Sequence, residues 1–186
     1  MIKLFTVSKK GGNSGKDWNG ATPKPFFACM HKEGVKTIWD VRRTPNGQYG
    51  SFFDTKIMEW GCEHEKIKFE WRLDLAPEKE LFAACNRDNW DLLTYAKAYF
   101  TPTVIAALNK VQSAEELDGV AILCAEQELY NCHRLLIAEY FAAKFPSLAV
   151  KHLGLAYDRY GNEKNAVPRA VMHNTRIFIK QLIEGK

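Results

Sequence analysis

The sequence lacks a long apolar run, an internal repeat and a low-complexity tract. No apolar stretch approaches the ~18 residues that a membrane-spanning helix needs, so we expect no membrane partner. Charge of one sign is also scarce. There are 26 Lys and Arg against 22 Asp and Glu, and a net charge of +4 does not by itself indicate nucleic-acid binding. A hydrophobic fraction of 46% argues against disorder.

Disulfide chemistry has little support in the sequence. The five cysteines are an odd number, and no Cys-x-x-Cys pair occurs. Residues 1–7 are too short for the apolar region of a secretion signal, and a Gly/Lys-rich loop over residues 8–20 follows them. We therefore expect a cytoplasmic protein with reduced thiols, in which a cysteine is a core residue, a reactive group or a metal ligand.

Short apolar segments alternate with segments of helical spacing. Strands are predicted over residues 2–7, 35–41, 66–73, 119–124 and 149–153. Helices are predicted over residues 25–32, 52–62, 89–111 (restarting at Thr101-Pro102), 131–144 and 169–184, with an irregular segment over 74–88. This alternation is typical of a three-layer α/β fold with a mostly parallel sheet of about five strands and flanking helices. With 186 residues, we expect a single domain.

Polar residues follow most of the predicted strands. In an open parallel sheet, ligands bind outside the carboxyl ends of the strands. We therefore expect one rim to carry Lys9 and Lys10, then Asp40, Arg42 and Arg43, then Arg72 and Asp74, then Cys124 and Glu126, and finally Lys151 and His152. Exposed strand ends are often polar without any function, so these residues taken singly are weak evidence.

The strongest pattern is Cys124-Ala125-Glu126 followed, five residues later, by Cys132-His133-Arg134. Asn131 is expected to cap the next helix, which would put Cys132, His133 and Arg134 in its first turn. The unpaired N–H groups and the positive dipole end of that turn favour an anion. They should also lower the pKa of a cysteine there, with help from Arg134. His133 titrates near neutral pH.

Two segments of this sequence resemble a known family. Trp39-Asp40-Val41-Arg42 with Pro45, and Leu123-Cys124-Ala125-Glu126 with Cys132-His133-Arg134, are similar to the signature motifs of the domain of unknown function 488 family. The resemblance covers roughly residues 1–153 and leaves residues 154–186 as a C-terminal loop and helix extension. It implies an α/β domain with the motif residues close together, and it implies no reaction. Val7-Ser8-Lys9 departs from the Gly-His-Ser-like turn usual at that place.

The leading hypothesis is a rim site that binds an anionic small molecule or nucleotide, with covalent processing as a further step. Cys124 or Cys132 would be the nucleophile, and Glu126 or His133 would handle protons. The substrate would be held by Asp40, Arg42, Arg43 and Arg134. The competing interpretation is that both cysteines are buried packing residues and that Asp40 forms an internal ion pair with Arg42.

Two alternatives stay open. One is a nucleic-acid-binding or base-recognising module without thiol chemistry. It would use a basic face with loop aromatics, namely Lys9, Lys10, Lys16, Arg42, Arg43, Arg159, Lys164, Arg169, Arg176 and Lys180 with Trp18, Tyr49, Phe52, Tyr157 and Tyr160. The other is a zinc site of Cys124, Cys132 and His133 with Glu126 or His152. We assign no cofactor and no metal to the leading hypothesis. We expect core positions for Trp39, Trp60, Trp71 and Trp90.

Overall fold

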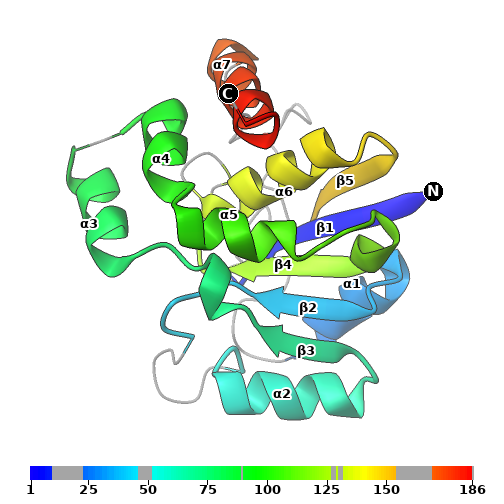
Figure 1. The fold of residues 1–186 in the computed structure, drawn as a ribbon. Helices are drawn as coiled ribbons and strands as arrows, with labels where there is room; N and C mark the ends of the chain where they lie inside the picture. The colour runs from blue at the N-terminus through cyan, green and yellow to red at the C-terminus, as the bar shows by residue number, and fades with distance from the viewer. Residues whose placement is uncertain are drawn as a thin grey trace, which may run out of the picture.

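The computed structural model describes residues 1–9, 23–45, 52–88, 90–126, 129, 132–153 and 169–185. Five strands form one sheet in the order β3-β2-β4-β1-β5, and every neighbouring pair is parallel (Figure 1). They are β1 (Ile2–Ser8), β2 (Thr37–Asp40), β3 (Lys68–Trp71), β4 (Val120–Cys124) and β5 (Leu148–Leu153). The helices are α1 (Lys24–Glu33), α2 (Thr55–His64), α3 (Lys79–Asp88), α4 (Leu92–Tyr99), α5 (Pro102–Asn109), α6 (His133–Lys144) and α7 (Arg169–Ile183).

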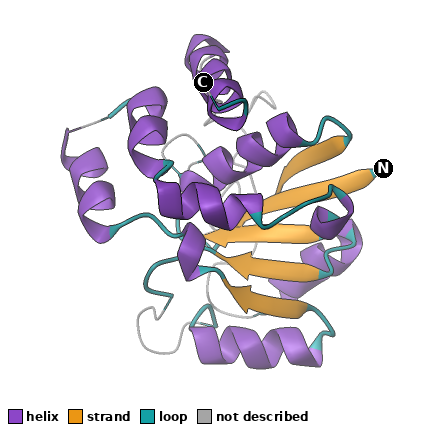
Figure 2. Ribbon diagram, in the orientation of Figure 1, coloured by secondary structure: helices purple, strands orange, loops and turns teal. Residues whose placement is uncertain are grey.

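The sheet is the middle of three layers. Helices α1 and α2 pack on one face, and α4, α5 and α6 pack on the other, with α7 outside α4 and α6 (Figure 2). The side chains of β4 divide between the two faces: Ala121 and Leu123 join the core under α1 and α2, whereas Ile122 and Cys124 join the core under α4 to α6. A strand covered on both faces needs apolar residues at every position, which explains the continuous Val-Ala-Ile-Leu-Cys run. The predicted three-layer α/β fold is therefore confirmed.

At the carboxyl end of β4, the segments that follow neighbouring strands leave toward opposite faces of the sheet. The segment after β4 leads to α6 on one face, whereas the segments after its neighbours β1 and β2 lead to α1 and α2 on the other face. Adjacent strands whose connections leave in opposite directions create a crevice at their carboxyl ends. Cys124 is the last residue of β4 and stands at this crevice.

Three details of the sequence prediction are wrong. The segment predicted as irregular contains helix α3, a short amphipathic helix whose apolar positions were overlooked among its charged residues. Trp60 and Trp71 are 65% and 45% exposed rather than in the core. In α2 the buried face is Met58, Gly61 and Cys62, so Trp60 faces outward. Trp71 belongs to β3, an edge strand that pairs only with β2.

Within the described residues, no helix combines the length and the apolar composition that crossing a membrane requires.

Candidate functional site

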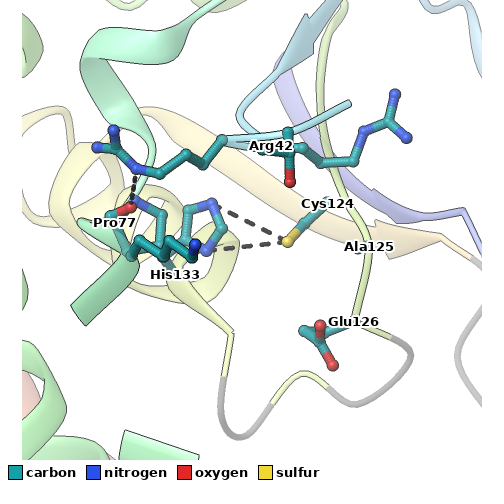
Figure 3. Close-up of a pocket in the computed structure, with 9 residues that line it drawn as sticks. Arg42, Pro77, Cys124, Ala125, Glu126 and His133 are labelled. Carbon is teal, nitrogen blue, oxygen red and sulfur yellow. Dashed lines mark hydrogen bonds between the residues drawn. The ribbon is translucent and has the colours of Figure 1, made fainter. Parts of the chain in front are cut away.

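A pocket of about 230 Å³ opens at the carboxyl ends of β2 and β4. It is lined by Arg42, Arg43, Thr44, Pro77, Lys79, Cys124, Ala125, Glu126 and His133 (Figure 3). These residues come from four segments far apart in the sequence: the chain after β2, the start of α3, the chain after β4 and the first residue of α6. Cys124 is only 3% exposed, although it lines the pocket.

Cys124 and His133 form the centre of the site. The Cys124 Sγ atom lies 3.8 Å from Nδ1 and 3.9 Å from Nε2 of His133. These near-equal distances put the sulfur beside the ring rather than in line with one N–H. The His133 Nε2 atom lies 2.9 Å from the carbonyl oxygen of Val41, which only accepts, so Nε2 carries a hydrogen and donates it. The ring is thereby fixed next to the sulfur.

Cys132 and Arg134 lie behind this pair. Cys132 is the N-cap residue of α6, and its side chain makes no capping hydrogen bond. Nη1 of Arg134 donates to Cys132 Sγ over 3.1 Å and to the carbonyl oxygen of Glu126 over 2.5 Å. Arg134 is only 2% exposed, so its positive charge is held inside the protein beside the sulfur atoms. A buried cation at this place stabilises negative charge on them.

The two thiols and the imidazole titrate as one group. Burial is the strongest single influence on Cys124 and raises the pKa of its thiol. The hydrogen bond from Cys132, the charge and hydrogen bond of His133, and the charge of Arg134 together outweigh burial and hold that pKa well below 9.0. Burial and the neighbouring Cys124 raise the pKa of Cys132, whereas the Cys124 thiolate raises the pKa of His133 against the effect of burial. These directions favour a Cys124 thiolate beside a His133 imidazolium, with Cys132 remaining a thiol.

Asp40 and Arg42 form a buried ion pair next to the pocket. Their side chains are 0% and 4% exposed. Arg42 donates from Nε to Oδ1 over 2.8 Å and from Nη2 to Oδ2 over 2.5 Å, and Nη2 also donates to the carbonyl oxygen of Phe53. Figure 3 shows the Arg42 side chain turned away from Cys124. The pair braces the chain at Val41, whose carbonyl holds His133.

Arg43 and Lys79 bring positive charge to the pocket, and Glu126 brings negative charge. The Arg43 guanidinium lies over the turn before α3: Nε donates to the carbonyl oxygen of Pro77 over 2.5 Å, and Nη2 is 3.1 Å from Glu78 Oε1. The Arg43 side chain is 30% exposed, so its charge remains accessible to solvent and to a ligand.

Of the residues expected at the rim, Arg72 and Asp74 line a different pocket, His152 lines a third, Lys151 pairs with Glu33, and Lys10 lies outside the described residues. The eight residues that the leading hypothesis names do lie together around Cys124. Arg42, Arg43, Cys124, Glu126 and His133 line the pocket, and Cys132, Arg134 and Asp40 lie directly behind them. The helix start is wrong by one residue, because Cys132 is the N-cap and α6 begins at His133. Asn131, expected as the cap, lies outside the described residues. Sequence reasoning missed Lys79, since helix α3 was not recognised and its first residue was not tied to any strand end.

The structure brings together part of the expected zinc site and little of the expected nucleic-acid-binding face. For zinc, the ligand atoms of Cys124, Cys132 and His133 lie within 4.8 Å of one another, but neither Glu126 nor His152 belongs to this group among the described residues. His152 Nδ1 lies instead 2.8 Å from Thr6 Oγ1.

Of the basic and aromatic face expected for nucleic-acid binding, Arg42 and Phe52 are buried rather than on the surface. Other members lie outside the described residues, namely Lys10, Lys16, Trp18, Tyr49, Tyr157, Arg159, Tyr160 and Lys164.

Comparison with known proteins gives a family and no closer relative. Neither the curated proteins nor the solved structures contain a match to this chain. The model of the family described as Domain of unknown function DUF488 matches residues 22–141, inside the span that the motifs predicted. The matched segment runs from the start of α1 into α6 and includes both motifs, whereas β1 and β5 lie outside it. Because the match covers well over half of the sequence, the chain belongs to the DUF488 family.

Proposed function

We propose that this protein is a cysteine-dependent enzyme that binds an anionic substrate and uses Cys124 as its nucleophile. One observation carries the proposal: the Cys124 sulfur lies 3.8 Å from a fixed His133 ring, and both residues line a pocket. A nucleophilic cysteine needs a thiolate, a neighbouring base or cation and access to substrate. The proposal assigns all three to Cys124, which lines the pocket beside His133 and has a lowered pKa, whereas Cys62 is fully buried with its pKa raised to about 12.

Each residue of the site has its own role in the proposed reaction. The Cys124 thiolate forms a bond to the electrophilic atom of the substrate, and the bond to the leaving group breaks. His133 supplies the proton that the leaving group needs, since its imidazolium is paired with the thiolate in the resting site. Water then attacks the covalent intermediate, Glu126 accepts the proton of that water, and the Cys124 thiolate departs. Arg134 stabilises the thiolate without contacting the substrate.

The charge around the pocket supports an anionic substrate. Arg42, Arg43 and Lys79 are the cations that line it. Asp40 neutralises the buried Arg42, and Glu78 pairs with Arg43, whose side chain is 30% exposed, so Lys79 contributes most directly to the positive charge. A volume of about 230 Å³ is smaller than the ~300–1,000 Å³ typical of sites for drug-sized ligands. The pocket therefore suits the reacting group of the substrate and one adjoining anionic group, and the rest of a nucleotide would extend outside.

A second candidate function is a zinc-dependent hydrolase, favoured by the three convergent ligand atoms of Cys124, Cys132 and His133. Two thiolates and an imidazole are ligands that zinc prefers, and three protein ligands leave a position for water. Glu126 lines the pocket and would accept the proton of that water. Metal analysis of the purified protein separates the candidates, since a stoichiometric zinc ion would occupy the Cys124 sulfur and block its alkylation.

The test is the rate at which iodoacetamide alkylates each cysteine between pH 5 and pH 9, read by peptide mass spectrometry on the native protein. We expect Cys124 to react fastest, with an apparent pKa well below the ~8.5 of a free thiol. Half-buried Cys29 is the internal reference, and buried Cys62 is the negative control. If Cys124 reacts no faster than Cys29 in metal-free protein, the nucleophile proposal is wrong, and binding of nucleotides and single-stranded nucleic acid at low salt becomes the next measurement.

A further inference from the structure

We propose that Cys124 and Cys132 are a redox pair, in which a hydroperoxide oxidises Cys124 and Cys132 then closes a reversible disulfide. The inference rests on the proposed function, because it requires Cys124 to be the reactive thiol. It gives a role to Cys132, which the proposed reaction does not use. Both cysteines are buried, at 3% and 0% exposure, and both sulfurs belong to the group whose ligand atoms lie within 4.8 Å of one another.

The local structure permits the sulfurs to meet. They lie within 4.8 Å of each other, and a disulfide bond needs them about 2.05 Å apart. Cys132 stands outside the regular helix, with φ −124° and ψ 129°, and its side chain caps no helical N–H group. Rotation of the Cys132 side chain toward Cys124 therefore breaks no hydrogen bond of α6. It exchanges the 3.1 Å contact with Arg134 Nη1 for a bond to sulfur.

The chemistry balances in two steps. The Cys124 thiolate attacks an oxygen of the hydroperoxide, so that an S–O bond forms, the O–O bond breaks, and the alcohol or water leaves with a proton from His133. The Cys132 sulfur then attacks the sulfenic acid, so that the S–S bond forms and the S–O bond breaks. The hydroxide that leaves takes the Cys132 proton as water. A dithiol supplies the two electrons that restore both thiols.

The surrounding charges impose the order of these steps. While Cys124 is a thiolate, its negative charge lies within 4.8 Å of the Cys132 sulfur and opposes a second thiolate there. Once Cys124 is an uncharged sulfenic acid, that restraint disappears, and Arg134, 3.1 Å from Cys132 Sγ, favours the Cys132 thiolate. The resolving thiol thus becomes nucleophilic only after the first oxidation. The disulfide would withdraw the nucleophile from catalysis and keep it from irreversible oxidation to the sulfinic acid.

The experiment treats the reduced full-length protein with one equivalent of hydrogen peroxide, blocks remaining thiols and measures intact and peptide masses. Wild type should lose the mass of two hydrogen atoms and give a peptide pair linked through Cys124 and Cys132, both reversed by dithiothreitol. Cys132→Ser should instead give a sulfenic acid that dimedone traps and, with a second equivalent of hydrogen peroxide and no dimedone, a gain of two oxygen atoms at Cys124. Cys124→Ser should resist oxidation at this ratio. Cys85→Ser is the matched control and should behave as wild type, since Cys85 is buried in the same core.

Two results would overturn the inference. In one, wild type passes to the sulfinic acid as fast as Cys132→Ser does. In the other, the disulfide joins Cys124 to a cysteine other than Cys132. If Cys124 is alkylated rapidly but forms no disulfide, the redox pair is refuted and the proposed function stands. If Cys124 resists both iodoacetamide and peroxide, both proposals are wrong.

Discussion

Replacement of Asp40 by Asn should destabilise the protein by about 3–5 kcal/mol, although the two side chains have nearly the same shape. The reason is the buried charge of Arg42. Its guanidinium is 4% exposed, and three of its contacts with Asp40 are hydrogen bonds to the carboxylate: Nε and the backbone N to Oδ1, and Nη2 to Oδ2. Asn removes the negative charge and offers one oxygen, so the Arg42 charge remains desolvated without compensation.

The chain contains its own control. Arg72 and Asp74 form an ion pair of the same two residue types at the same sequence separation, with Nε to Oδ1 at 2.9 Å and Nη2 to Oδ2 at 3.0 Å. Their side chains are 16% and 32% exposed, so water solvates much of the Arg72 charge when Asn removes the negative charge of Asp74. Asp74→Asn should therefore cost only about 1 kcal/mol or less. Urea unfolding at pH 7 measures both variants, with equal m-values as the check on two-state behaviour. A cost for Asp40→Asn within about 1 kcal/mol of Asp74→Asn would refute the argument from burial.

Asp40→Asn should also affect the candidate site, because the backbone at Val41 connects the ion pair to His133. Val41 lies between Asp40 and Arg42, and its carbonyl oxygen accepts the hydrogen bond that fixes His133. In folded Asp40→Asn protein, we expect the alkylation profile of Cys124 to move to higher pH, whereas Asp74→Asn should leave it unchanged. A purely structural role for the ion pair would lower stability without moving this profile.

Three further predictions test other parts of the structure. His133→Asn should raise the apparent pKa of Cys124 in the alkylation profile, since it removes the imidazolium that stabilises the thiolate; an unchanged profile would remove His133 from the mechanism. Burial, and then the charge of Arg134, lowers the pKa of His152 from 6.5 to about 4. The unfolded chain therefore binds a proton between these values that the folded chain does not, and stability falls by up to about 3 kcal/mol as the pH drops from 6.5 to 4. His152→Gln should lack this part of the loss in urea unfolding, and equal pH slopes for both proteins would contradict it. Gly119→Ala should cost more stability than Gly34→Ala, because both residues have positive φ (80° and 79°) but only at Gly119 would a Cβ meet atoms, at 2.8 Å from Lys36 Cγ. Thermal unfolding compares the two, and equal costs would show that strain at φ is the whole effect.

The sequence predicted the strands well because the three central strands, β2, β4 and β1, are mostly buried and therefore leave a recognisable apolar pattern. A run such as Val-Ala-Ile-Leu-Cys in β4 has few alternatives to a strand buried on both faces. Exposed amphipathic elements were harder to predict from the sequence. The helix predicted over residues 52–62 corresponds to α2, but Trp60, expected in the core, lies on its exposed face, because helical periodicity does not say which side of a helix meets the sheet.

The role of Arg42 shows a similar limit at the site. The same sequence pattern, an Asp and an Arg two residues apart at a strand end, is compatible with two roles. The two residues can bind a ligand, or they can form an internal ion pair. The difference depends on Phe53, eleven positions further on, whose carbonyl oxygen accepts from Arg42 Nη2 and which is itself buried. No pattern around Arg42 predicts that contact. The two interpretations were therefore both open until the surroundings of the guanidinium were known.

The proposed nucleophile and the lysine proposed to face the substrate are held by different parts of the molecule, and this separation can be measured. The main chain at Cys124 is fixed by two neighbouring strands, because its carbonyl accepts from Lys9 N at 3.0 Å and the carbonyl of Leu123 accepts from Val41 N at 3.1 Å. Lys79 comes instead from the start of α3, outside the sheet. Lys79→Glu should therefore leave alkylation by neutral iodoacetamide unchanged and slow alkylation by anionic iodoacetate about fivefold, the effect of roughly 1 kcal/mol of charge interaction across solvent. Lys110→Glu, on a lysine that does not line this pocket, makes the same change of charge and should alter neither rate. If both variants slow iodoacetate equally, net charge rather than the pocket sets the preference, and Lys79 does not belong to the substrate site.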